Sequence, residues 1–127
     1  MSENPRYKDN LIVNLTFEFS LDIIAFSETL NGLKKYNLSN QLFRSGTSIG
    51  ANVKEAQNAE SKADFIHKMK IAIKEADETE YWLMLCKQSK EYPDTSDILT
   101  KLNSIIKILN KIIVKQLILN ACFLCQL

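Results

Sequence analysis

Few residues in this chain have the type and spacing that catalysis or metal binding requires. His67 is the only histidine, which excludes the paired Glu-x-x-His motifs of a di-iron bundle, and we interpret it as a surface residue. Cys122 and Cys125 are spaced like half of a zinc site, but tetrahedral zinc needs about four ligands and no second pair lies nearby in the sequence. We therefore expect a protein that is not an enzyme and that holds neither a metal nor a cofactor.

Lysines set the charge of the last part of the chain. The whole chain has a net charge of only +1, yet residues 98–127 contain no acidic residue and four lysines, namely Lys101, Lys107, Lys111 and Lys115. The last three are four residues apart, so on a helix they form one ridge that is able to meet the phosphates of RNA or DNA. The alternative is a solvated face that keeps an apolar helix in solution, which is what charge runs usually mean.

Polar residues at helical spacing form a second set in the middle of the chain. An arginine guanidinium can hold a carboxylate through two parallel hydrogen bonds, and the arginine of this set is able to do so among the helices. We interpret the set as a buried polar network that fixes the register of two helices, and a ligand site is the alternative. The set comprises Arg44, Ser45, Ser48, Asn52, Glu55, Glu75 and Glu78.

Four segments with helical periodicity position these residues. Apolar residues recur at intervals of three and four, which predicts helices over residues 11–36, 39–58, 62–91 and 95–120. No strand-like alternation competes with this interpretation. Because the connections are short, we expect an all-α, antiparallel up-down four-helix bundle that forms a single domain over residues 1–127.

Side chains that cap helices mark the start of each segment. Asn10, Ser39 and Ser61 precede the first three helices, and Ser61 opens a capping box with the acid three residues later. Asp94 or Thr95 is the expected cap of the fourth helix. A proline at position 93 is expected to stop the third helix before it.

Two glycines interrupt the apolar stripe of the second helix. Gly46 and Gly50 lie where each glycine costs about 1 kcal/mol relative to alanine. Gly46 belongs to a stripe with Leu42, Ile49 and Val53 at the spacing of a buried helical face. We expect close packing against another helix to offset the cost, so this segment is predicted to be the tightly packed centre of the bundle.

Composition favours a cytoplasmic globular protein. The chain has 127 residues and is 46% hydrophobic with two prolines, which is typical of one helix-rich domain. Its first residues are polar and lack the layout of a secretory signal. Lysines interrupt the most apolar region, residues 105–119, so no membrane span is expected. The odd number of cysteines, three, fits a reducing compartment.

The fourth helix carries more apolar surface than one seam of a bundle needs. Ile113, Val114, Leu117 and Ile118 widen its apolar arc, and the tail over residues 121–127 is uncharged. We expect self-association through the first and fourth helices, and the alternative is a tail that folds back over the end of the bundle. Aromatic residues Tyr81 and Trp82 are more typical of a core or an interface, with base stacking as the alternative.

Three sequence blocks resemble the bacterial 23S rRNA intervening-sequence proteins, also called the four helix bundle protein family. The blocks are QLFRSGTSIGANVKEA at residues 41–56, AESKADFIHK at residues 59–68 and KEADETEYWL at residues 74–83. The resemblance covers the first three helices and weakens after residue 93. It implies an up-down bundle that assembles into a homopentamer. A similar accessory protein of diversity-generating retroelements is a basic pentamer that binds nucleic acid, whereas this chain is near neutral.

Together these observations predict a non-enzymatic, homo-oligomeric four-helix bundle that serves as an RNA- or DNA-associated scaffold. If five copies assemble, each lysine ridge is presented five times, so a modest charge per chain becomes substantial per ring. The alternative is a protein-interaction module that recruits an unknown protein partner through the apolar surface of the fourth helix, without nucleic acid. The two differ in their response to salt, because phosphate binding weakens steeply with salt and apolar binding does not.

Overall fold

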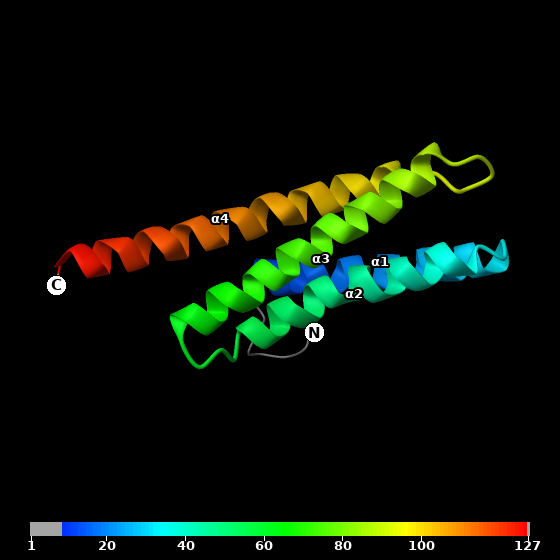
Figure 1. Ribbon diagram of the computed structural model, residues 1–127. Helices are drawn as coiled ribbons and strands as arrows, with labels where there is room; N and C mark the ends of the chain where they lie inside the picture. Colours follow the sequence, from blue (N-terminus) through cyan, green and yellow to red (C-terminus); the bar gives the residue numbers. More distant parts are fainter. Residues whose placement is uncertain (1–8, 127) are drawn as a thin grey trace.

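The computed structural model describes residues 9–126, with side chains described through residue 121. Its four helices are α1 (Leu11–Gly32), α2 (Tyr36–Ala56), α3 (Lys62–Gln88) and α4 (Ser96–Gln126), and no strand occurs in this range. Consecutive helices run in opposite directions and pack side against side (Figure 1). The predicted all-α, up-down four-helix bundle is confirmed.

Two of the predicted helix caps have the expected geometry. The side chain of Asn10 accepts a hydrogen bond from the backbone N–H of Val13 at the start of α1. At the start of α3, the hydroxyl of Ser61 accepts from the N–H of Asp64 at 3.0 Å, and the Asp64 carboxylate accepts from the N–H of Glu60. Each cap satisfies a backbone donor that has no partner inside the helix.

The predicted cap of α2 is wrong. α2 begins at Tyr36, before Ser39, and its actual N-cap residue, Lys35, makes no side-chain capping bond. Ser39 is buried inside the helix, where its hydroxyl donates to the carbonyl of Ser27 on α1 at 2.9 Å. The Ser39 hydroxyl therefore bonds between two helices instead of capping α2, and the local sequence does not reveal this contact.

The ends of three helices also differ from the prediction. α1 ends at Gly32 because Lys34 adopts a left-handed conformation (φ 63°) that lets the N–H of Lys35 donate to the Leu30 carbonyl. α3 ends at Gln88, ahead of the expected proline stop. α4 begins at Ser96, whose N–H and hydroxyl both donate to Asp94, and it runs beyond residue 120 to Gln126.

The core lies where the apolar stripes of the four helices meet. Among the largest fully buried side chains are Phe19 and Ile23 from α1, Leu42 and Ile49 from α2, Met69 and Leu83 from α3, and Leu102 and Leu109 from α4. Burial on this scale contributes about 1.5–3 kcal/mol for each large apolar side chain. This packing holds the outer faces of the helices in fixed positions.

α4 is the least enclosed helix of the bundle. It contacts α3 and α1 less extensively than α2 contacts its own two neighbours. Its C-terminal part projects beyond the ends of the other three helices (Figure 1). Gln116 still lies level with the α2–α3 connection, near Ala59 and Ser61, so the projection follows this residue. Within the described residues, no helix is long and apolar enough to span a membrane.

Candidate functional site

The four lysines of α4 do not act as one group in the structure. The ammonium group of Lys101 pairs with the carboxylate of Asp22 on α1 at 2.8 Å. The hydrogen bond from Lys101 and the charge of Asp22 together raise the pKa of Lys101. Lys101 is therefore tied to a neighbouring helix, which separates it from the three lysines that follow.

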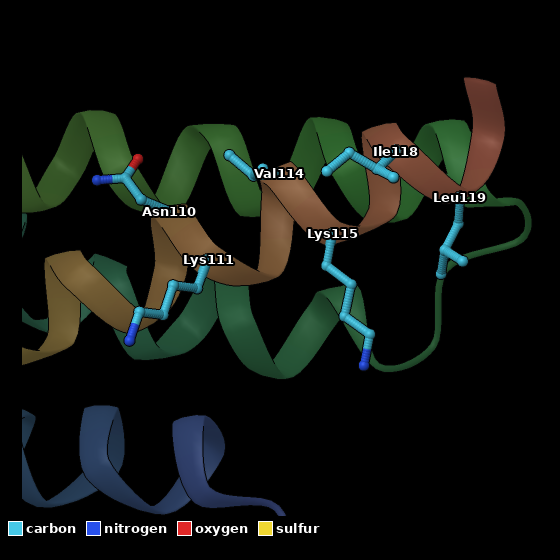
Figure 2. A pocket seen from close by; sticks show the side chains of 6 residues that line it. All are labelled: Asn110, Lys111, Val114, Lys115, Ile118 and Leu119. Atoms are coloured by element: carbon cyan, nitrogen blue, oxygen red, sulfur yellow. The ribbon is translucent and has the colours of Figure 1, made fainter. Parts of the chain in front are cut away.

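Lys107, Lys111 and Lys115 form what we call the lysine row. All three side chains are exposed, and none makes an ion pair with any residue that the structure describes. Figure 2 shows Lys111 and Lys115 extending to the same side of α4. The spacing predicted from the sequence is thus realised as a continuous basic ridge on the outer surface of the bundle.

An apolar surface lies beside the lysine row. Val114 is 53% exposed and Ile118 is 56% exposed, and both lie next to Lys111 and Lys115 on the outer surface of α4 (Figure 2). A shallow hollow of about 420 Å³ is lined by residues of α4 alone, among them Val114, Ile118 and Leu119. Nothing else in the described chain covers this surface.

A second exposed apolar surface lies on α1. Leu11 is 61% exposed, Leu21 is 52% exposed and Phe17 is 39% exposed. Between α1 and α4 lies a hollow of about 480 Å³ whose lining includes Leu15, Leu21 and the Asp22–Lys101 pair. The two helices that were predicted to mediate self-association therefore both leave large apolar side chains in solvent.

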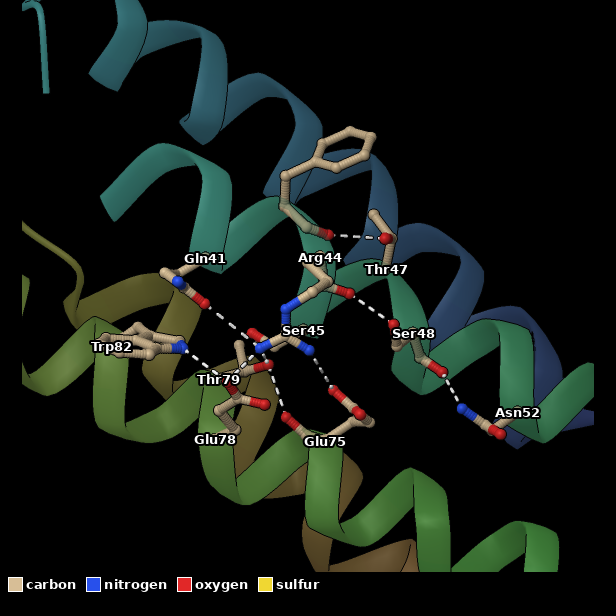
Figure 3. A network of polar contacts seen from close by, with 11 residues as sticks. Gln41, Arg44, Ser45, Thr47, Ser48, Asn52, Glu75, Glu78, Thr79 and Trp82 are labelled. Atoms are coloured by element: carbon tan, nitrogen blue, oxygen red, sulfur yellow. Dashed lines mark hydrogen bonds and ion pairs between the residues drawn. The ribbon is translucent and has the colours of Figure 1, made fainter. Parts of the chain in front are cut away.

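Arg44 lies between two glutamates of α3. Its guanidinium pairs with the carboxylate of Glu78 and lies 3.6 Å from Oε2 of Glu75, as Figure 3 shows. Glu78 also accepts a hydrogen bond from the indole N–H of Trp82 at 3.3 Å. The predicted burial is wrong for the arginine, because 52% of its side chain is exposed. This cluster connects α2 and α3 at their surface.

Apart from Glu75 and Glu78, no member of the predicted polar set bonds to the guanidinium of Arg44. The Ser48 hydroxyl donates to the Arg44 carbonyl, and the Asn52 amide donates to the Ser48 carbonyl at 2.8 Å, so both bond within α2. Glu55 pairs with Lys68 of α3 at 3.3 Å. Helical spacing placed these residues on one face of α2, but each one bonds to a different local partner.

The sequence interpretation missed several residues that bond to the polar set, among them Thr79 and Trp82. Thr79 is completely buried, and its hydroxyl contacts that of Ser45. Trp82 orients its indole against Glu78. The signal for Thr79 was a polar residue within an otherwise apolar stripe. No comparable signal marked Trp82, because its partner on the same helix depends on a rotamer choice.

The two predicted close-packing glycines both face α1. A Cβ atom on Gly46 would lie 2.8 Å from Cγ1 of Ile23, and one on Gly50 would lie 3.1 Å from the backbone oxygen of Thr16. Both distances are shorter than ordinary van der Waals contact. The absence of a side chain at these positions allows α1 and α2 to approach closely.

The residues first considered for metal binding or acid–base chemistry do not come together. His67 is exposed, as expected. Cys86 is buried, and burial raises the pKa of its thiol to about 11. Cys122 and Cys125 lie outside the residues whose side chains are described. Among the described residues, no three His, Cys, Asp or Glu side chains are grouped as metal ligands.

Comparison with known proteins identifies the family. The family model of the 23S rRNA-intervening sequence proteins matches residues 8–111. A solved structure from Bacteroides thetaiotaomicron, described as a protein of unknown function from the S23 ribosomal protein family, is 42% identical and has a TM-score of 0.77. The match covers 80% of this chain and 97% of that one. No curated protein matches the chain. The chain therefore belongs to the 23S rRNA-intervening sequence protein family.

Proposed function

We propose that this protein is a non-enzymatic scaffold in the cytoplasm that assembles with copies of itself and binds the phosphate backbone of RNA or DNA. The lysine row is the observation that carries the proposal. Three cations lie along one exposed ridge, and no carboxylate of the described chain neutralises them. Such a ridge suits binding that depends on charge and not on base sequence.

Self-assembly is part of the proposal because one chain alone presents little net charge. The exposed apolar residues of α1 and α4 are of the kind that become buried between protein copies. A closed ring of five, as the resemblance to the family implies, repeats the lysine row once per copy. The phosphate backbone then meets several rows at once, which raises the effective affinity well above that of one chain.

The test measures binding of duplex RNA and duplex DNA across a salt series, with the assembly mass recorded in each buffer. A triple variant changes Lys107, Lys111 and Lys115 to glutamine. The matched control changes three exposed lysines of α3, Lys62, Lys70 and Lys74, to glutamine, so both variants lose the same charge.

We expect the α4 variant to lose affinity strongly while the α3 control retains most of it. If each of the three lysines meets a phosphate, the salt slope becomes shallower by about 3 for every copy in contact. Equal affinities of the two variants would contradict the assignment of the lysine row. Absence of binding by the unmodified oligomer at low salt would overturn the nucleic-acid role altogether.

A second candidate function rests on the apolar hollow of α4. Val114 and Ile118 offer an apolar surface that a protein partner is able to cover without nucleic acid. Binding of this kind is nearly independent of salt, and it is lost on changing Val114 and Ile118 to serine. The assembly mass of the serine variant separates binding of another protein from self-association. If the surface is an interface between copies of this chain, the mass falls in this variant; if it binds only another protein, the mass stays the same.

A further inference from the structure

A hollow of about 510 Å³ lies at the end of the bundle where α2 begins and α3 ends. This is the end opposite the projecting part of α4 (Figure 1). The rings of Trp82 and Tyr92 line it, together with the carboxamides of Asn37, Asn40 and Gln41. Its volume falls within the range of about 300–1,000 Å³ that is typical of small-molecule sites. No acidic side chain lines it, so a ligand with negative charge meets no carboxylate there.

The indole ring of Trp82 is held in position before any ligand arrives. Its N–H donates to Glu78, and the guanidinium of Arg44 in turn holds that carboxylate. Tyr81 contacts the ring edge-on, with the ring centroids 5.2 Å apart. Trp82 remains only partly buried. The polar network between α2 and α3 therefore orients an aromatic ring at the wall of the hollow, and a ring fixed in advance loses little entropy on binding.

The carboxamides of the hollow have hydrogen-bonding capacity to spare. Asn37 and Asn40 are exposed, and neither makes a side-chain hydrogen bond within the described residues. The Gln41 oxygen accepts from Arg44 at 3.4 Å, which leaves its NH₂ group available. Figure 3 shows Gln41 and Trp82 on the same side of Arg44, one from α2 and the other from α3. Each amide offers donors and an acceptor, the groups that pair with the edges of a nucleobase.

A lysine lies against Tyr92, one of the residues that line the hollow. The ammonium group of Lys35 lies 4.7 Å from the centroid of the Tyr92 ring. The residues immediately before these two, Lys34 (φ 63°) and Glu91 (φ 66°), are the non-glycine residues with positive φ in the described chain. A conformation of this kind costs on the order of 1 kcal/mol. The two turns thus bring a cation and an aromatic ring together beside the carboxamides.

We propose that this hollow binds an unpaired nucleobase, which stacks on the aromatic rings and hydrogen-bonds to Asn40 and Gln41. Lys35 lies where it meets a phosphate attached to that base. The inference deepens the proposed function, on which it rests, by adding a site for single-stranded nucleotides to the backbone contacts of the lysine row. A free nucleotide offers the same chemistry, so the test must separate the two sources.

Trp82 is the only tryptophan, so its fluorescence reports directly on this hollow. The full-length protein is titrated with AMP, with UMP, and with single-stranded oligo(A) and oligo(U) RNA, while duplex RNA, whose bases are all paired, serves as the comparison. Quenching by the oligonucleotides alone identifies a single strand as the source. Quenching by the mononucleotides as well identifies a nucleotide site that needs no strand, and both results support the hollow.

Variants show whether the quenching arises here. We expect Tyr92→Ala to weaken binding by about 5-fold or more, the loss typical of one base-stacking contact. The double variant Asn40→Ala/Gln41→Ala should also weaken it, and Asn103→Ala, an exposed amide on α4, is the matched control. Trp82→Phe, followed by anisotropy of a labelled oligonucleotide, should keep much of the affinity that Trp82→Ala loses. Circular dichroism confirms that each variant is folded.

Two results would overturn the inference, and both can be distinguished from a failure of the lysine row to bind duplexes. No quenching by any single-stranded or mononucleotide ligand would do so, even if duplex RNA binds through α4. Quenching that persists unchanged in Asn40→Ala/Gln41→Ala and in Tyr92→Ala would place the ligand elsewhere. Conversely, mononucleotide quenching without duplex binding would support the hollow and contradict the lysine row.

Discussion

Ser45 and Thr79 are completely buried between α2 and α3, and their hydroxyl oxygens lie 2.9 Å apart. The Thr79 hydroxyl also lies 2.7 Å from the carbonyl of Glu75, to which it donates. A buried hydroxyl that loses its partner costs about 1–3 kcal/mol. This pair is therefore the buried part of the polar contact between the two helices, whereas Arg44 lies at its exposed edge.

Replacing Thr79 with valine should lower the free energy of unfolding by about 1–3 kcal/mol, because Ser45 then loses its buried partner. Urea denaturation measures the change. The double variant Ser45→Ala/Thr79→Val should cost less than the sum of the two single variants, since neither hydroxyl remains to be satisfied. Strictly additive losses would show that the two hydroxyls do not interact.

Glycine substitutions should have opposite effects at two positions. Gly46→Ala should destabilise the protein by about 1–3 kcal/mol, because the new Cβ lies 2.8 Å and 2.9 Å from Cγ1 and Cγ2 of the buried Ile23. Gly32→Ala should stabilise by up to about 1 kcal/mol, since a Cβ there meets nothing within 4 Å. In an Ile23→Ala background, the penalty for Gly46→Ala should fall or reverse. A penalty that stays the same in this background would assign it to another contact.

Arg44→Ala should reduce stability by about 1 kcal/mol, the upper part of the range for a half-exposed ion pair. Without Arg44, the negative charges of Glu75 and Glu78 repel each other with no cation between them. The Oε2 atom of Glu75 is in addition buried without a hydrogen bond. The matched control is Lys68→Ala, which removes the other ion pair between α2 and α3 and should cost less, because 61% of the Glu55 side chain is exposed. Unchanged melting and unchanged assembly mass in Arg44→Ala would show that the cluster has no structural role.

Cys86 should be chemically inert in the folded protein. Burial raises the pKa of its thiol from 9.0 to about 11, so the thiolate that reacts is nearly absent around neutral pH. In a Cys122→Ser/Cys125→Ser background, thiol reagents should label Cys86 only when the chain is unfolded. Rapid labelling of the native protein would show that α3 opens at this position.

The same raised pKa predicts how stability depends on alkaline pH. A group whose pKa is higher in the folded state contributes stability that is complete below its unfolded value and is lost as pH rises through the folded value. The contribution of Cys86 should therefore be intact below pH 9.0 and should disappear towards pH 11. The Cys86→Ala variant has no thiol to titrate at this position, so its stability should fall less steeply between pH 9.0 and about pH 11. Parallel curves for the two proteins would contradict the prediction.

Lys101 and Lys111 should differ in their effect on nucleic-acid affinity. Lys101 already pairs with Asp22, so a phosphate must compete with a carboxylate for it, whereas Lys111 has no such competitor among the described residues. Lys111→Gln should therefore weaken duplex binding more than Lys101→Gln. Asp22→Asn should release Lys101 and strengthen binding. Equal losses for the two lysine variants would show that total charge alone determines affinity.

Much of the fold could be predicted from local sequence. The apolar stripe through Leu42, Ile49 and Val53 is buried as expected, because a period near 3.6 fixes which side of a helix is apolar. Asn10 and Ser61 cap their helices because a capping bond joins residues only three apart. The sequence also determined the family and the ridge on which the lysine row lies.

Only the tertiary structure decided which of these groups find partners. Ser39 bonds to Ser27 instead of capping α2, and Lys101 pairs with Asp22 on a helix 79 positions earlier in the chain. Trp82 and Gln41 come from different helices, so the hollow that they line exists only once α2 and α3 pack together. Periodicity specifies the face of one helix, but pairing and exposure depend on distances between helices, which arise from packing of the whole core.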